Sequence, residues 1–226
     1  MKPVDLGMSQ RFSRKFWLSV FLGVAFPLSV FALLATLVAV NPDALPWDTS
    51  LMLALHPFAN PQMDRVAAIA SQFGTTWGVI PVTLLLIAVA AWKARWRIAI
   101  YLGLTLIGSS LLNNALKTLW HRARPALWEV AKPHLDFSFP SGHAMSSMTF
   151  VATLILLNWN KPLNPFLLVY GGLFVVIIGW TRLYLGVHFP SDILAGWMVS
   201  IALAVSTALL VFKPAQEAET AISDEQ

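Results

Sequence analysis

The amino-acid sequence predicts an all-α integral membrane protein whose six transmembrane helices form one bundle. Of its 226 residues, 57% are hydrophobic and only 12% are charged, whereas a soluble domain has about 45–50% apolar and about 25% charged residues. The mean hydropathy of +0.67 agrees. This composition excludes a soluble enzyme and a disordered chain. Because the net charge is only +4 and the basic residues are scattered, it also excludes a nucleic-acid-binding module.

Six stretches without Asp, Glu, Lys or Arg approach or exceed the about 20 apolar residues that cross a bilayer. They are Phe16–Val40, Val66–Trp92, Ile98–Leu116, Phe137–Asn160, Pro162–Thr181 and Ile193–Phe212. The second and fourth stretches have polar ends, so we expect the spans themselves to be shorter. The second span then begins near Gly74 and the fourth near Ser141. The first is far longer than the roughly 7–15 apolar residues of a signal peptide, so we interpret it as a retained helix. The shorter segment Asp48–His56 predicts a helix in the non-cytoplasmic interface.

Basic residues determine the predicted orientation, because cytoplasmic loops carry an excess of Lys and Arg. They occur in segment 1–15, in the link between the second and third spans, and in the link between the fourth and fifth. We therefore expect a cytoplasmic N-terminal segment (1–15), a membrane domain (16–212) and an acidic cytoplasmic tail (213–226). The 3–4 and 5–6 links lie on the opposite side, yet they also hold several basic residues that this rule does not explain.

Polar clusters in these two links indicate a functional site on the non-cytoplasmic face. Lys117, Arg124 and Arg182 supply three cations beside low-dielectric helices, and ionisable residues at a span indicate function by default. Three cations match a phosphate group, because its oxygens accept charge-assisted hydrogen bonds and guanidinium binds it bidentately. The alternative is that these side chains extend to lipid headgroups.

The run Ser141-Gly142-His143 adds a second feature suited to phosphate. Pro140 ends any preceding helix, and Ser141 is a good N-cap for the fourth span. The free N–H groups of the first turn then attract an anion, which Gly142 allows to approach the backbone. Simple capping is the alternative role for Ser141, and the two are compatible. His143 lies in that first turn, where a purely structural histidine has no obvious purpose.

His188 and Asp192 are four residues apart and flank Pro190, which we expect to open the sixth helix. An ionised Asp192 can accept the Nδ1 proton of His188 and leave Nε2 as a nucleophile. The rival interpretation is a metal site built from two histidines and one carboxylate, although the nearby cations would repel a metal. The sequence contains no cysteine, so thiolate ligands are excluded.

Other polar residues receive simpler interpretations. His56 and His134 are expected to be interfacial or loop residues. His121 lies between the cations of the 3–4 link and is a candidate contact at the rim of the site. Asn113 and Asn114 fall within the third span, where hydrogen bonding between helices is the expected role.

Together the clusters resemble the three-part signature of the type 2 phosphatidic acid phosphatase superfamily. Lys-x6-Arg-Pro matches residues 117–125, Pro-Ser-Gly-His matches 140–143, and Ser-Arg-x5-His-x3-Asp matches 181–192 with Thr181 in place of Ser. The resemblance implies a phosphatase without metal or cofactor that works through a phosphohistidine. It implies that His188 is the nucleophile, that Asp192 orients it and that His143 protonates the leaving oxygen. The phosphate-binding residues that it implies are Lys117, Arg124, Ser141, Gly142 and Arg182.

The expected substrate is a membrane lipid with a terminal phosphate or diphosphate, and the expected location is a bacterial inner membrane with the site facing the periplasm or cell exterior. Undecaprenyl diphosphate is the first candidate, and phosphatidic acid and phosphatidylglycerol phosphate are the alternatives. A lipid phosphotransferase would need the same residues. A non-catalytic lipid-binding or transport protein is a further alternative from another class. The sequence indicates no oligomeric state.

Overall fold

The computed structural model describes residues 14–75, 77–128 and 136–212, and the regular secondary structure of these segments is entirely helical, as predicted. The helices are α1 (Arg14–Val20), α2 (Phe26–Val40), α3 (Pro46–Leu55), α4 (Pro61–Phe73), α5 (Val79–Trp92), α6 (Trp96–Trp120), α7 (Gly142–Leu157), α8 (Asn164–Phe166), α9 (Gly172–Tyr184) and α10 (Pro190–Val211). Short π-helical turns join α1 to α2 and α8 to α9. Most of segment 1–15, all of the tail 213–226 and His134 lie outside the described residues.

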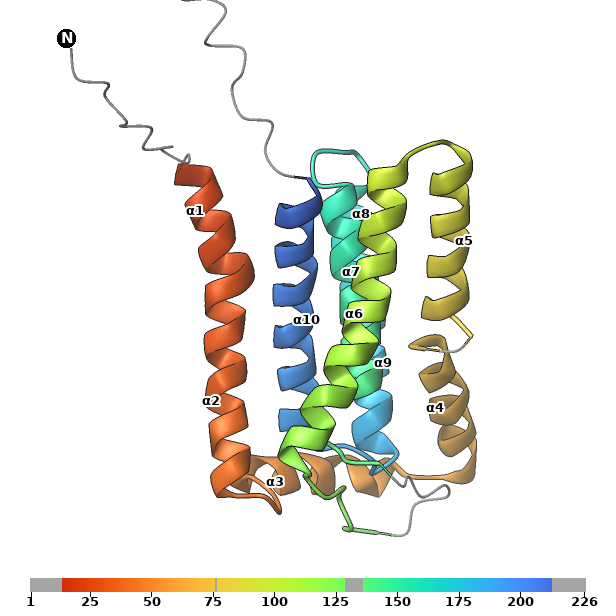
Figure 1. The fold of residues 1–226 in the computed structure, drawn as a ribbon. Coiled ribbons are helices and arrows are strands. Elements are labelled where there is room, and N and C mark those ends of the chain that lie inside the picture. Colours follow the sequence, from red (N-terminus) through yellow and green to blue (C-terminus); the bar gives the residue numbers. More distant parts are fainter. Residues whose placement is uncertain (1–13, 76, 129–135, 213–226) are drawn as a thin grey trace, which may run out of the picture.

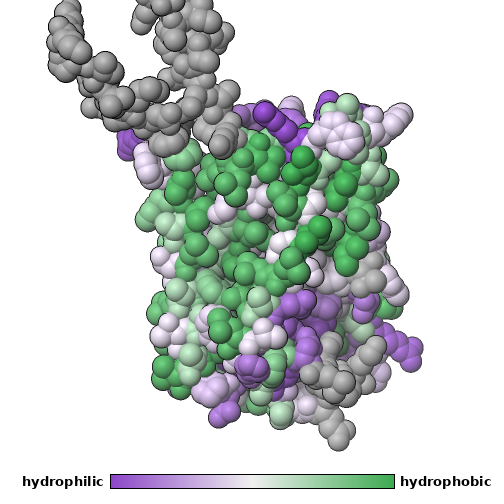
Figure 2. Space-filling view, viewed as in Figure 1, coloured by the Kyte–Doolittle hydropathy of each residue, from purple (hydrophilic) through white to green (hydrophobic). Residues whose placement is uncertain are grey.

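Four helical stretches are long and apolar enough to cross a membrane, which makes this a multi-pass membrane protein. They are Phe16–Val40, Trp96–Trp120, Asn164–Tyr184 and Pro190–Val211. The helices α5 and α7 are also apolar but have only 14 and 16 residues. Figure 2 shows hydrophobic side chains over the middle of the molecule and hydrophilic ones gathered at its two ends. This distribution suits a bundle whose sides face lipid.

The second predicted span departs from its expected start. We expected a helix from about Gly74, but α4 ends at Phe73 and α5 begins only at Val79. The chain turns so tightly between them that a Cβ on Gly78 would collide with the carbonyl of Phe73, which a helix without this break would not require. In Figure 1, α4 and α5 lie end to end at one side of the bundle.

Helix α10 organises the bundle, because it packs against α2, α6 and α7. Its buried face is rich in small residues, including Ala195, Gly196 and Ala202, which permit close approach between membrane helices. A Cβ added to Gly196 would lie only 3.1 Å from the carbonyl oxygen of Ser141. The N-terminal ends of α7 and α10 therefore meet, which brings two predicted clusters together.

The helix expected at Asp48–His56 is present as α3, which begins slightly earlier, at Pro46. In Figure 1 it lies across the end of the bundle where α6 ends and α10 begins. Its Asp48 is fully buried, which the prediction of an interfacial helix did not indicate. This end of the bundle contains the candidate site.

Candidate active site

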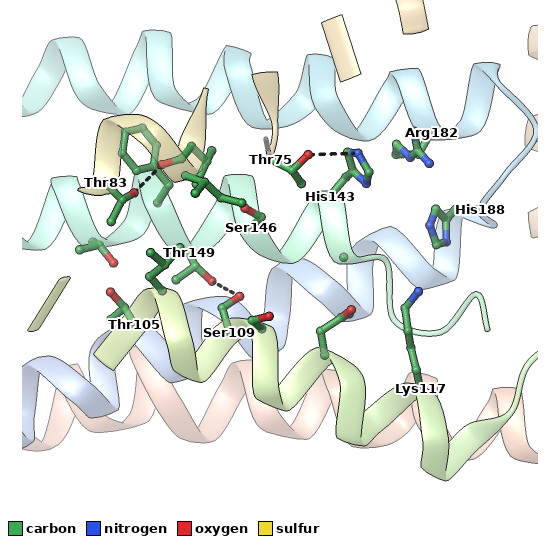
Figure 3. A pocket seen from close by; sticks show the side chains of 18 of the residues that line it. Thr75, Thr83, Thr105, Ser109, Lys117, His143, Ser146, Thr149, Arg182 and His188 are labelled. Carbon is green, nitrogen blue, oxygen red and sulfur yellow. Dashed lines mark hydrogen bonds between the residues drawn. The ribbon is translucent and has the colours of Figure 1, made fainter. Parts of the chain in front are cut away.

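A cavity of about 270 Å³ opens among α5, α6, α7 and the links that precede α7 and α10. Six of the predicted site residues line it: Lys117, Arg124, Gly142, His143, Arg182 and His188. Figure 3 shows Lys117, His143, Arg182 and His188 at one end of the cavity, and Thr83 and Thr105 at the other. Ser141 and Asp192 are buried behind this lining. The structure therefore brings clusters far apart in the sequence into one place.

The cations of the 3–4 link are connected by Asp136, which sequence analysis did not identify. Lys117, on the last turn of α6, donates a hydrogen bond to the Asp136 carboxylate. Arg124 donates from Nη2 to Asp136 Oδ1 (2.7 Å) and from Nε to the Asp136 carbonyl (2.9 Å). Burial opposes ionisation of Asp136, but the hydrogen bond from Lys117 and the charges of Arg124 and Lys117 outweigh it, so the pKa of this carboxyl lies well below its usual range.

Arg124 also reaches the predicted nucleophile. Its Nη1 lies 3.1 Å from Nε2 of His188 and donates to the carbonyl of Val187 at 2.6 Å. The guanidinium is therefore adjacent to the nitrogen on which we expect chemistry. An anion that contacts Nε2 of His188 would meet this cation immediately.

Arg182 approaches the cavity from α9 and is almost fully buried. Its Nη1 donates a 2.6 Å hydrogen bond to Oγ of Ser71, on α4. Ser71 was not predicted, because a serine in a helical pattern carries no local mark of the arginine that it contacts 111 positions later. The contact orients the guanidinium from a helix that supplies no motif residue.

The start of α7 has the capping geometry that the sequence predicts. Ser141 is the N-cap, and its Oγ accepts a hydrogen bond from the Ala144 amide at 3.5 Å. Asn113 on α6 donates to the carbonyl of Pro140 at 3.0 Å, which fixes this turn. It also donates to Sδ of Met145 on α7 at 3.2 Å, which is the predicted contact between helices. His143 lies in the first turn, with Nε2 3.5 Å from Oγ1 of Thr75.

His188 is buried, and its two ring nitrogens face different partners. Nδ1 lies 3.3 Å from Oδ2 of Asp192, while Nε2 faces Arg124 and the cavity. Pro190 is the first residue of α10, as expected, and Oδ2 of Asp192 also accepts the Phe189 amide at 2.9 Å. A carboxylate that holds Nδ1–H leaves the Nε2 lone pair directed at the cavity.

Behind this pair lies a buried ionic cluster that sequence analysis missed. Arg122 donates to Asp192 Oδ1 at 2.6 Å and to Asp48 Oδ2 at 2.9 Å, and all three side chains have 0% exposure. Buried charges are stable when they are paired and hydrogen-bonded. Arg122 follows a predicted membrane helix, and a charge at that place was a visible signal. No local sequence pattern indicates that it pairs with Asp48, which lies 74 positions earlier.

The remaining polar candidates lie outside the cavity lining. His56 stacks on Trp128, with ring centroids 4.1 Å apart. His121 ends α6 with a left-handed backbone (φ 47°) and contacts the edge of Phe137; the structure does not place it in the cavity as the rim contact that we considered. Asn114 lies on the exposed side of α6.

Fold and site define a membrane-embedded helical bundle with a cationic, histidine-containing cavity at one end, and the chain belongs to the PAP2 superfamily, whose model matches residues 98–215. It is 29% identical over 142 residues to an undecaprenyl-diphosphatase of Sulfolobus acidocaldarius, covering 61% of this chain and 65% of the relative. It is 39% identical over 100 residues to phosphatidylglycerophosphatase B of Bacillus subtilis, covering 41% and 48%. The chain thus spans less than two thirds of either relative.

Its fold is similar to the crystal structure of a transmembrane PAP2-type phosphatidylglycerolphosphate phosphatase from Bacillus subtilis. The TM-score is 0.72 at 24% identity, over 84% of this chain and 98% of the other. This similarity shows the fold. The family model confirms the predicted family, and the relatives carry names of lipid phosphatases, the enzyme class that the sequence predicts.

Proposed function

We propose that this protein hydrolyses the terminal phosphate or diphosphate of a membrane lipid, without a metal, through a phosphohistidine on His188. The observation that carries the proposal is the position of His188 Nε2, 3.1 Å from the Arg124 guanidinium in a cavity that Lys117 and Arg182 also line. Three fixed cations around a nucleophilic nitrogen suit a phosphoryl group, since preorganised charges are usually the largest catalytic contribution.

In this mechanism the phosphoryl oxygens contact Lys117, Arg124 and Arg182 and the amides at the start of α7. Nε2 of His188 attacks phosphorus while Asp192 holds the Nδ1 proton. The nitrogen–phosphorus bond forms as the bond from phosphorus to the leaving oxygen breaks, and His143 gives that oxygen a proton. Water then attacks phosphorus and gives a proton to His143 as the nitrogen–phosphorus bond breaks, which releases phosphate and restores both histidines.

The six-span topology is part of the proposal. Helices α5 and α7 are short. Helix α4 lies end to end with α5, at the end of the bundle that contains the cavity (Figure 1), so α4 and α5 together are long enough to cross a membrane. Basic residues at the opposite end, among them Lys93, Arg95 and Lys161, favour a cytoplasmic location for that end. The cavity would then open to the periplasm or cell exterior of a bacterial inner membrane.

The shape of the cavity supports a lipid substrate. Its lining follows α6 from Lys117 back to Leu102, which is about 22 Å at 1.5 Å per residue. The deep end combines apolar side chains, such as Leu106 and Phe150, with hydroxyl groups. A hydrocarbon chain can therefore enter between helices while its phosphate remains among the cations. Undecaprenyl diphosphate remains our first candidate, with phosphatidic acid and phosphatidylglycerol phosphate as alternatives.

The decisive experiment measures phosphate release by detergent-purified protein in EDTA, with undecaprenyl diphosphate and phosphatidic acid side by side. We expect release that His188→Ala abolishes and that His56→Ala, a matched change outside the cavity, preserves. Activity in His188→Ala, or a loss in EDTA that added metal restores, would refute the phosphohistidine mechanism. Transfer of phosphate to a second lipid instead of water would identify a phosphotransferase, and identical behaviour of wild type and His188→Ala in every assay would indicate a non-catalytic lipid-binding protein.

A further inference from the structure

The buried cluster behind His188 is built around Arg122, the largest of the fully buried side chains. Its Nη1 donates to Asp192 Oδ1 (2.6 Å) and to Oγ of Ser191 (2.7 Å), and its Nη2 donates to Asp48 Oδ2 (2.9 Å). Its guanidinium carbon lies 4.3 Å from the centre of the Phe189 ring, a cation–π contact. Neither Arg122 nor Asp48 is among the cavity-lining residues, so both act on a substrate only through other groups.

Each oxygen of Asp192 consequently has a separate task. Oδ1 is held by Arg122, while Oδ2 accepts the Phe189 amide and faces Nδ1 of His188. A carboxylate fixed at both oxygens cannot rotate away from the imidazole. Arg122 and the Phe189 amide therefore together fix the carboxylate that Nδ1 of His188 faces.

Asp48 holds the other side of the Arg122 guanidinium. Its Oδ1 accepts the Ser191 amide at 2.9 Å and its Oδ2 accepts the Ser191 hydroxyl at 2.6 Å, so α3 is tied to the start of α10. Because Oδ2 also accepts Nη2 of Arg122, the guanidinium is held between two carboxylates and cannot turn away from Asp192.

We propose that Arg122 and Asp48 are positioning residues of this active site: Arg122 holds Asp192 against His188, and Asp48 holds Arg122. This inference rests on the proposed function, because the orientation of His188 matters when Nε2 attacks phosphorus. If Asp192 shifts, the imidazole can turn away from the attack geometry, and this lowers kcat more than it weakens substrate binding.

The test compares Arg122→Gln, Asp48→Asn and their double variant with the matched control Asp43→Asn, an exposed acidic residue of the α2–α3 link. We expect Arg122→Gln to lower kcat at least tenfold while KM and the inhibition constant of orthophosphate change less than twofold, because the cavity keeps its phosphate-binding residues. Asp48→Asn should lower kcat in the same way but less. Because Asp48 acts through Arg122, the kcat of the double variant should lie within threefold of that of Arg122→Gln.

A purely structural role predicts losses that multiply in the double variant and that appear in the melting temperature rather than in kcat. An Arg122→Gln kcat within twofold of wild type, or multiplied losses in the double variant, would overturn the inference. If the double variant does not fold, Arg122→Lys, which keeps the charge but reaches one carboxylate at a time, must lower kcat at unchanged KM. These outcomes are distinct from failure of the proposed function, in which wild type itself shows no release that depends on His188.

Discussion

Replacement of Arg124 by alanine tests the cationic cavity most directly. Nη1 of Arg124 lies 3.1 Å from the nitrogen that we propose attacks phosphorus, so the guanidinium is within reach of the phosphoryl oxygens as their charge develops. One such preorganised donor is worth roughly 3–4 kcal/mol of transition-state stabilisation. We therefore expect kcat/KM for lipid phosphate hydrolysis to fall by about 10²- to 10³-fold at 25 °C.

Arg124 also donates to the carbonyls of Asp136 and Val187, so a structural contribution must be separated from the electrostatic one. Arg124→Lys keeps the charge but loses the planar fork, and we expect it to lose only about tenfold. Arg65→Ala, an exposed arginine on α4, is the matched control and should behave like wild type. The assay is phosphate release in detergent, with thermal unfolding of each variant recorded in parallel.

A loss of less than tenfold in Arg124→Ala would refute this reasoning, since it would show that the guanidinium acts only as a headgroup contact. Equal losses in Arg124→Ala and Arg124→Lys would also refute it, because charge would then contribute nothing and the link geometry would account for the whole effect.

Two further predictions follow from contacts that only the structure displays. Ser71→Ala removes the acceptor of a 2.6 Å hydrogen bond from Arg182. Because a hydrogen bond to a charged group is worth about 1.5–3 kcal/mol, we expect kcat/KM to fall by roughly tenfold or more. An unchanged kcat/KM would show that Arg182 keeps its position without α4. Asp136→Asn should lower the melting temperature at pH 7, because the pKa of Asp136 is held below its usual range by its ion pairs with Lys117 and Arg124. Since the ionised form of Asp136 is favoured in the folded state, this stabilisation is fully present above the unfolded pKa of about 4 and is lost as pH falls through the folded pKa. The difference in melting temperature between wild type and Asp136→Asn should therefore narrow below pH 4. A difference that does not depend on pH would contradict this prediction.

Several features were accessible from sequence because their causes are local. The apolar stretches, the proline that opens α10 and the N-cap at Ser141 each follow from neighbouring residues. The boundary of the second span was less accessible, since the turn at Gly78 depends on its close approach to Phe73. The length of α6 was also underestimated, because Lys117 was treated as the end of the span although it occupies the last turn of the helix.

The site divides in the same way. The sequence motifs identified the cations and the histidines, because a motif is defined by residue types and their spacing along the chain. They did not indicate Asp136 between Lys117 and Arg124, or Ser71 against Arg182. Those partners are ordinary residues whose importance lies only in what they contact.

By itself, the sequence determined that this protein belongs in a membrane, roughly where its helices run, and which chemistry its motifs suit. These properties depend on composition and on residues a few positions apart. Only the tertiary structure decided that Asp48, on α3, shares a buried arginine with Asp192. Burial and charge pairing arise when distant segments pack together and exclude water, so the surroundings of His188 were settled by the fold of the whole bundle.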